Sequence, residues 1–311
     1  MSDNLTLGID LGGTQLRAAI IDKNGALLRR AAVATDVAGG PNAIVSQMVK
    51  LFDEVAEDFK DRVTAAGVSS PGPLDLDNGL TSDLPTLPGW LNFPLRDTLS
   101  KKLLLPVVLE NDGIAAANGE WKFGAGRGLN NLVYVTVSTG IGGGVVVDGH
   151  LMHGRRGMAA HVGHMMIDPE GPICGCGGKG CIEGIASATA FGVAARRSGY
   201  VDGKHAVKAA RSGDARALAL LDTEATWLGY AFVSLLHLYS PEILVVGGGL
   251  SSALDLMMAG IRNQIDRYAM PAFREIQVVT AELGDNAGLV GAAALAMQTT
   301  WSSFGSNESV H

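Results

Sequence analysis

Four potential metal ligands lie close together in the second half of the sequence. His164, Cys174, Cys176 and Cys181 follow the pattern H-x9-C-x-C-x4-C, with glycines between the thiols. Three thiolates and one imidazole form a closed tetrahedral Zn²⁺ site, which has a structural role because it keeps no open position. Three buried structural thiols are the alternative, but they would not need the interleaved glycines. The spacing therefore predicts a structural zinc loop. With no further cysteine for a disulfide framework, it also favours a reducing, cytoplasmic compartment.

Three glycine-rich turns lie next to predicted strands, at 8–14, 138–144 and 247–249. Their backbone N–H groups can surround a phosphate, and Asp10 in the first turn can hold Mg²⁺ through water. Each turn alone is equally well explained as an ordinary tight turn. The first is not a Walker loop, because it lacks the lysine and the following helix. Together they indicate a nucleotide site, with these candidate phosphate and ATP contacts: Asp10, Gly12, Gly13, Thr14, Thr139, Gly140, Gly142, Gly247, Gly248 and Gly249.

A carboxylate, Asp112, stands where a predicted apolar strand ends and a helix begins. At a strand end facing a cleft, such a group can accept the proton of a hydroxyl nucleophile. The simpler interpretation is that Asn111 or Asp112 only caps the helix. The glycine turns favour the catalytic interpretation.

The elements that must position these groups alternate between strands and helices. Strands are predicted at 5–11, 16–22, 26–34, 63–69, 106–109, 131–138, 143–149, 242–247 and 275–280, and helices at 41–60, 113–121, within 186–240, and at 252–267 and 287–298. The stretch 71–94 is predicted to be an ordered binding loop and the tail from 299 to be irregular. The strand, glycine turn and strand recur in both halves, which indicates an internal duplication. We expect an α/β protein with a mixed sheet in each of two lobes.

Composition excludes several classes of protein. The 311 residues are 47% apolar and 18% charged, with a formal net charge of −7. This is typical of a globular protein and unfavourable for wrapping nucleic acid. No apolar stretch approaches the roughly 20 residues that span a bilayer, and the polar start predicts no signal peptide. We therefore expect no nucleic-acid partner and no membrane association.

The motifs together resemble the ROK family of sugar kinases and sugar-responsive repressors, in family order from Gly8 to about Leu295. The resemblance implies a two-lobed ribonuclease H-like fold, as in actin-like ATPases, with domains 1–112 plus 287–311 and 113–286. It implies ATP with Mg²⁺ as donor, a hexose held between the lobes, and assembly as a homodimer or larger homo-oligomer. Asp112 corresponds to the catalytic base and Gly247–Gly249 to the adenosine loop. The implied sugar contacts are Gly72, Asn111, Asp112, His161, His164 and Glu183.

Two positions depart from the family pattern. Family kinases commonly carry Glu three residues before the zinc histidine, where this chain has His161, and Asn where it has Thr86. A carboxylate only accepts hydrogen bonds, whereas a neutral imidazole accepts one and donates one. If His161 faces the sugar, the exchange alters which ring substituents are tolerated; if it faces away, the exchange is silent.

Several functions stay open at this point. The hydroxyl is expected to be O6 of glucose or a close hexose by family analogy, with an N-acetylated amino sugar or fructose as alternatives. Polyphosphate in place of ATP is not excluded. A catalytically weak sugar sensor is disfavoured by Asp112 and the glycine turns. A DNA-binding repressor is disfavoured because only seven residues precede Gly8 and the chain is acidic.

Overall fold

The computed structural model describes residues 4–84 and 87–305, with side chains described as far as residue 298. Contacts divide the chain into two compact units. The first comprises residues up to Gly128, the segment Leu151–Ala159 and residues from Asp285 onward; the second comprises Leu129–His150 and Ala160–Gly284. The chain therefore passes more than once from one unit to the other.

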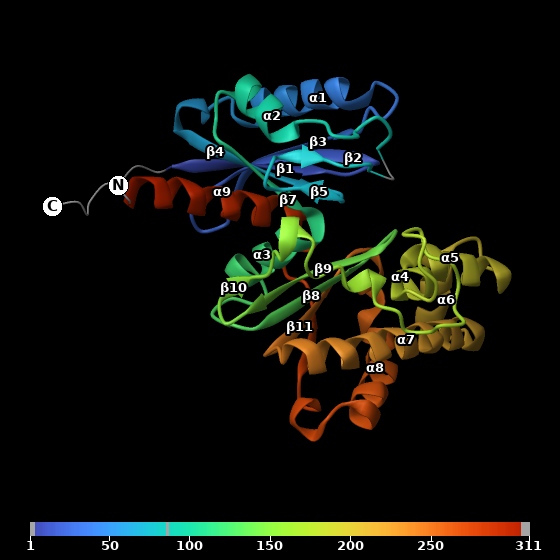
Figure 1. Cartoon of the computed structure of the whole chain (residues 1–311). Helices are drawn as coiled ribbons and strands as arrows, with labels where there is room; N and C mark the ends of the chain where they lie inside the picture. Colours follow the sequence, from blue (N-terminus) through green and yellow to red (C-terminus); the bar gives the residue numbers. More distant parts are fainter. Residues whose placement is uncertain (1–3, 85–86, 306–311) are drawn as a thin grey trace. The chain divides into compact units, whose positions relative to one another are not determined.

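The first unit is built on a five-stranded mixed sheet of order β3-β2-β1-β4-β7. Its strands are β1 (Leu5–Leu11), β2 (Gln15–Ile21), β3 (Leu27–Ala34), β4 (Val63–Ser70) and β7 (Val107–Asn111). β1, β2 and β3 pair antiparallel, while β1, β4 and β7 run parallel. The parallel strands are buried almost throughout because helices cover both faces of the sheet. Figure 1 shows α1 (Gly40–Val55) and α2 (Leu95–Leu103) on one face and α9 (Ala287–Gly305) on the other.

Helix α9 packs unusually close to its neighbours, because glycines face it. A Cβ atom at Gly67 of β4 would overlap the backbone carbonyl of Ala292 in α9. Within α9, a Cβ at Gly291 would overlap the carbonyl of Ala115 in α3 (Asp112–Phe123). Only glycine allows such close backbone approach. These contacts fix α3, and with it Asp112 at its first turn, against the core of the first unit.

The second unit repeats the same strand order with a second sheet, β10-β9-β8-β11-β12. Its strands are β8 (Leu132–Val137), β9 (Ile141–Val147), β10 (His150–Leu151), β11 (Ile243–Gly247) and β12 (Gln277–Thr280). β8 pairs antiparallel with β9 and parallel with β11, as β1 does with β2 and β4. The helices of this unit are α4 (Ile182–Ala186), α5 (Ala188–Arg197), α6 (Gly203–Arg211), α7 (Ala215–Tyr239) and α8 (Leu254–Tyr268). The shared order supports the internal duplication expected from the sequence.

Several boundaries differ from the prediction. Helix α1 ends at Val55 rather than at 60, and short 3₁₀ turns supplement the helices at Lys60–Arg62, Arg155–Gly157, Val162–His164, Gly249–Ala253, Pro271–Phe273 and Gly284–Asn286. The loop 71–94 contains a two-stranded ribbon of β5 (Leu74–Asp75) and β6 (Leu80–Thr81). Helix α9 continues to Gly305, although the tail was predicted to be irregular from 299. No glycine or proline interrupts the sequence from 292 to 304, so nothing stops the helix earlier.

The α/β class with a mixed sheet in each half is confirmed, and the two-sheet arrangement fits the actin-like ATPase fold. The predicted domain division, 1–112 with 287–311 and 113–286, stays a prediction. The two units differ from it by placing residues 113–128, 151–159 and 285–286 with the first sheet. Among the described residues, none of the helices has both the length and the apolar character needed to cross a membrane.

Candidate active site

Asp10 is held from two sides at the carboxyl end of β1. Ser69 Oγ donates to one carboxylate oxygen of Asp10 at 2.9 Å, and Arg17 Nη1 donates to the other at 3.1 Å. Arg17 lies opposite Asp10 in the antiparallel register, which explains why the two meet. Desolvation raises the pKa of Asp10 despite these partners. With both oxygens already bonded to protein groups, Asp10 is suited to holding a hydrated Mg²⁺ through water rather than directly.

The first glycine turn comes directly after Asp10. Gly12 N–H donates to the Gln15 carbonyl at 3.1 Å, and Thr35 Oγ1 donates to the Gly12 carbonyl at 2.7 Å. The Thr14 side chain is exposed. Gly288, near the start of α9, approaches so closely that a Cβ there would lie 3.1 Å from Asp10 Oδ1. The predicted first phosphate turn is therefore a fixed loop beside the Asp10 carboxylate.

Asp112 occupies the first turn of α3 in the same unit. Asn111 is the N-cap, and its side chain accepts from the N–H groups of Gly113 and Ile114 at 3.1 and 3.4 Å. Asp112 Oδ1 accepts from Gly113 N–H at 2.8 Å, which leaves its second oxygen for another partner. Asn111 is therefore the N-cap, and Asp112 shares the Gly113 N–H with it at the start of α3.

The Asp112 carboxylate has an unusual charge environment. Solvent reaches its side chain, yet surrounding protein atoms desolvate it, and this desolvation together with the negative charge of Asp10 raises its pKa to about 6. A carboxyl group with a pKa near neutrality is a better general base than an ordinary aspartate. Gly72 adjoins this turn, since a Cβ there would lie 3.1 Å from Asn111 Nδ2. The structure therefore brings together Asp10, Gly72, Asn111 and Asp112.

In the second unit, Glu183 connects the second glycine turn to the cysteine cluster. Ile141 N–H donates to Glu183 Oε2 at 3.0 Å, and a Cβ at Gly140 would overlap the same carboxylate. The other oxygen, Oε1, lies 3.5 Å from Cys174 Sγ and 4.0 Å from His164 Nδ1. Gly142 and Gly143 pair within β9, whereas the sequence had led us to expect them in the turn. Gly143 fits there because a larger residue would strike the Tyr134 carbonyl and Val162.

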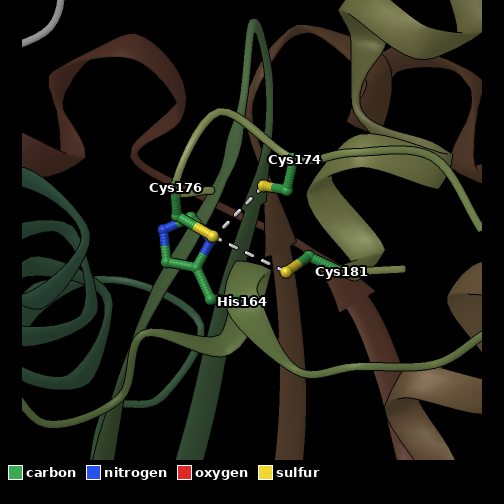
Figure 2. A group of neighbouring side chains, drawn as sticks. All are labelled: His164, Cys174, Cys176 and Cys181. Atoms are coloured by element: carbon green, nitrogen blue, oxygen red, sulfur yellow. Dashed lines mark hydrogen bonds between the residues drawn. The ribbon is translucent and has the colours of Figure 1, made fainter. Parts of the chain in front are cut away.

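The four predicted metal ligands converge on one point (Figure 2). Cys174 Sγ lies 3.7 Å from His164 Nδ1, and Cys176 Sγ lies 3.7 Å from Cys181 Sγ. Ligands bound to one tetrahedral Zn²⁺ at about 2.0–2.3 Å lie about 3.4–3.8 Å from each other. Burial raises the pKa of the Cys174 thiol to about 12, while the Gly178 N–H lowers that of Cys176. The donor set suits a structural zinc site, and its four ligand atoms lie within 4.8 Å of one another.

His161 stands beside this cluster, with its ring centroid 6.1 Å from that of His164. Burial, and then the neighbouring His164, lower the pKa of His161, so the ring is neutral at neutral pH. Its Nε2 atom is inaccessible and has no hydrogen-bond partner among the described residues. The other departure from the family pattern, Thr86, lies outside the described residues.

A cavity of about 900 Å³ lies within the second unit, between the second glycine turn, α5, α6 and the glycine loop after β11. Thr139 and Gly249, which were predicted to bind the nucleotide, both line it. Gly248 has φ of +82°, and Gly247 packs on the Tyr134 ring, so the loop turns sharply at the end of β11. A nucleotide-sized ligand fits a cavity of this volume.

Sequence reasoning missed the basic side chains of this cavity. Its lining includes Arg196, Lys204, Lys208 and Arg211, against one acid, Asp202. Arg211 is already paired with Asp255 by two contacts of 2.9 Å. The positions 204, 208 and 211 recur at i, i+4 and i+7, so helical periodicity would have placed them on one face of α6. The cavity is therefore electropositive, as a site for an anionic phosphate donor requires.

The protein belongs to the phosphoryl-transfer proteins with the actin-like ATPase fold. This class is indicated by the shared strand order of the two sheets, the glycine turns, the carboxylate at a strand end and the electropositive cavity. The ROK family model matches residues 6–299, so the chain belongs to the ROK family.

Similar proteins include sugar kinases. A glucokinase of Thermotoga maritima is 37% identical over 307 residues, which cover 93% of this chain and 96% of the relative. An N-acetylmannosamine kinase of Haemophilus influenzae is 32% identical over 292 residues, covering 92% and 93%. The crystal structure of a ROK family glucokinase from Streptomyces griseus in complex with glucose and AMPPNP superimposes with a TM-score of 0.83 at 35% identity. That match covers 95% of this chain and all of the other.

Proposed function

We propose that this chain is an ATP-dependent glucokinase, which transfers the γ-phosphoryl group of ATP to the 6-hydroxyl of glucose, with Asp112 as general base. Similarity to sugar kinases over nearly the whole chain supports the phosphoryl transfer. The observation that carries the role of Asp112 is its position. A carboxylate with a pKa of about 6 stands at the start of α3, with one oxygen unused by the cap. The first unit thus contributes the base, and Asn111 and Gly72 beside it would bind the sugar.

The base acts by taking the proton of the sugar hydroxyl while that oxygen attacks phosphorus. The bond between the γ-phosphorus and the bridging oxygen of ADP breaks as the new bond forms, and the proton passes to Asp112. Charge on the transferring group is stabilised by backbone N–H groups of the two glycine turns. Asp10, fixed by Ser69 and Arg17, would hold the Mg²⁺ that accompanies ATP through its water shell.

The second unit would bind ATP in its electropositive cavity. The glycine loop at 247–249 adjoins the adenosine end, and Thr139 and Gly140 adjoin the phosphates. Lys204 and Lys208, both at the cavity, supply positive charge toward the donor. Polyphosphate, which is also anionic, could serve as a second donor for the same reason.

His164 and the three cysteines would hold a structural Zn²⁺. The ion would fix the loop from 164 to 181 and with it Glu183, whose carboxylate lies between the cluster and the second glycine turn. With Nδ1 of His164 facing Cys174, the opposite ring nitrogen is the one that would meet a sugar hydroxyl. Glu183 and His161 are the other proposed sugar contacts in this unit. Assembly as a homodimer or larger oligomer in the cytoplasm stays a prediction.

The second candidate, an N-acetylmannosamine kinase, is favoured by one observation. His161 is neutral and has a buried, unpaired Nε2, so it can offer one donor or one acceptor but not the two acceptor oxygens of a carboxylate. An acetamido group offers one N–H donor and one carbonyl acceptor, so it could complement that atom once the ring turns to expose it.

A sugar panel distinguishes the two candidates. The wild-type protein and His161→Glu are assayed by coupled ADP release with ATP and glucose, mannose, fructose, N-acetylglucosamine and N-acetylmannosamine. We expect glucose to give the highest kcat/KM in the wild type, and we expect His161→Glu to change the ratio of kcat/KM between glucose and the acetylated sugars by about tenfold. Highest activity on N-acetylmannosamine would replace glucose by the second candidate. Silence on every sugar would contradict the kinase.

A further inference from the structure

Glu110 is a buried charge immediately before the proposed sugar-binding and catalytic residues. Its side chain is 3% exposed at the end of β7. One carboxylate oxygen, Oε1, accepts from the Asn111 backbone N–H at 2.8 Å. The other oxygen, Oε2, accepts from His153 Nε2 at 2.8 Å. Buried carboxylates are rare unless they are paired, and these two hydrogen bonds are the pairing that this one requires.

Its partner comes from an unusual segment of the chain. His153 lies in Leu151–Ala159, which belongs to the first unit although the residues on either side belong to the second. The segment is closed on itself, since Ala159 N–H donates to the His153 carbonyl at 2.9 Å. The His153 to Glu110 contact therefore fastens this excursion to the strand that carries Asn111.

A hydrogen bond of 2.8 Å joins the Glu110 carboxyl group to the imidazole of His153. The hydrogen bond with Glu110 is the largest cause that raises the pKa of His153, with desolvation by burial opposing it. The His153 side chain is 42% exposed, so it can exchange protons with solvent. A cavity of about 420 Å³ adjoins both residues, and its lining includes one more carboxylate, Asp77. The hydrogen bond and the charge of Glu110 are thus the side-chain contributions that favour the protonated ring.

We propose that His153 and Glu110 are a positioning pair for the catalytic turn, in which the imidazolium holds the buried Glu110 carboxylate so that it fixes the backbone of Asn111 and Asp112. The inference rests on the proposed role of Asp112 as base. Glu110 orients the Asn111 N–H, the Asn111 side chain caps Gly113 and Ile114, and Gly113 N–H in turn bonds to Asp112 Oδ1. Every link in this chain is a hydrogen bond of the first unit.

Three variants separate the charge of the pair from its shape. His153→Gln keeps a donor but removes the positive charge, which leaves Glu110 buried and uncompensated. Glu110→Gln keeps an acceptor for Asn111 N–H, and its amide can donate to a neutral His153 ring. Glu110→Leu loses both contacts without burying a charge. The control is His150→Gln, an exposed histidine three residues earlier whose Nδ1 lies 2.8 Å from the Asp148 carbonyl.

Each protein is assayed for kcat and for KM of ATP and glucose at saturating co-substrate, with the thermal unfolding midpoint measured in parallel. We expect kcat to fall by about tenfold to 10²-fold in His153→Gln and Glu110→Leu, because a small displacement of a catalytic group has that effect. Glu110→Gln should stay within about threefold of wild type, and KM for ATP should hold in all variants because the proposed donor cavity lies in the second unit. The control should match wild type.

The outcomes are distinct. The inference is wrong if His153→Gln keeps kcat within about twofold of an active wild type. Should His153→Gln fail to fold, the same criterion applies to Glu110→Leu. A lower unfolding midpoint with unchanged kcat assigns the pair a purely structural role and equally overturns it. If kcat falls as much in Glu110→Gln as in Glu110→Leu, the claim that His153 compensates the charge of Glu110 is wrong. Wild-type silence with every sugar overturns the proposed function itself, and this inference with it.

Discussion

The two units share one strand order, yet the first collects carboxylates whereas the second collects mainly cations and thiols. The first unit gathers carboxylates at the ends of β1 and β7, where Asp10, Glu110 and Asp112 are each bonded to neighbouring groups. The second gathers cations around its cavity, on α5 and α6, and thiols beside its glycine turn. The two related sheets thus carry an acidic cluster in the first unit and a largely basic cavity in the second.

The contrast between the two units indicates that the segments following the strands, rather than the sheets themselves, determine the chemistry of each unit. In both units the antiparallel pair delivers a glycine turn, and a parallel strand delivers the segment at its own carboxyl end. The two strands compared are not equivalent, because β11 takes the place of β4 and β12 that of β7. β7 leads into a helix with a carboxylate in its first turn, whereas β11 leads into a glycine loop. The proposed base and the proposed donor site therefore arise at the carboxyl edges of two related sheets.

The largest effect is expected from removing the Asp112 carboxylate of the first unit. Asp112→Asn keeps the shape of the side chain but cannot accept a proton at neutral pH. We expect kcat to fall by about 10²-fold or more while glucose binding, measured by calorimetry, is largely kept. Asp61→Asn, an exposed position of the same unit, serves as control. Retention of more than about a tenth of wild-type turnover would contradict the role of Asp112.

Loss of the metal should be the next largest effect. In Cys176→Ser one of four proposed ligands is replaced by a weak one, so we expect zinc content to drop and the unfolding midpoint to fall by about 5 °C or more. Lys179→Ala is the matched control, since Lys179 lies in the same loop and pairs with exposed Glu170. Equal zinc content in wild type and Cys176→Ser, measured by atomic emission, would refute the proposed ligand set.

The smallest effect should come from removing positive charge from the cavity of the second unit. Lys204→Ala combined with Lys208→Ala removes two charges from the cavity without disturbing the Arg211 pair. We predict a rise of about three- to tenfold in KM for ATP with kcat nearly unchanged, and a weaker dependence of KM on salt than in wild type. Arg197→Ala, on α5 but outside the cavity lining, provides the comparison. An unchanged KM would place the donor elsewhere.

Local patterns made much of this arrangement predictable. The glycine turns, the metal ligand pattern and the strand-end Asp112 are signals carried by neighbouring residues. The Arg17 to Asp10 contact can be inferred once the β1–β2 register is known, because the two face each other across the hairpin. The basic row on α6 was present as helical periodicity and was overlooked.

Other features depend on tertiary structure and could not be found from neighbours in sequence. His153 and Glu110 are 43 residues apart, and only the excursion of Leu151–Ala159 into the first unit brings them together. Gly142 and Gly143 were predicted to lie in a turn, but close approach of Tyr134 and Val162 places glycine within β9. The end of α1 at Val55 was also missed, because the apolar periodicity continues to Phe59, beyond the point where the helix stops.

The pH dependence of kcat/KM for glucose tests the central claim most directly. Desolvation and the charge of Asp10 raise the pKa of Asp112 to about 6, and a general base must be unprotonated to act. Lowering the pH through that value protonates Asp112, so kcat/KM should fall about tenfold per pH unit below about pH 6 and level off above it. A kcat/KM that stays constant down to about pH 5, with the fold intact by circular dichroism, would contradict the assignment of Asp112 as base.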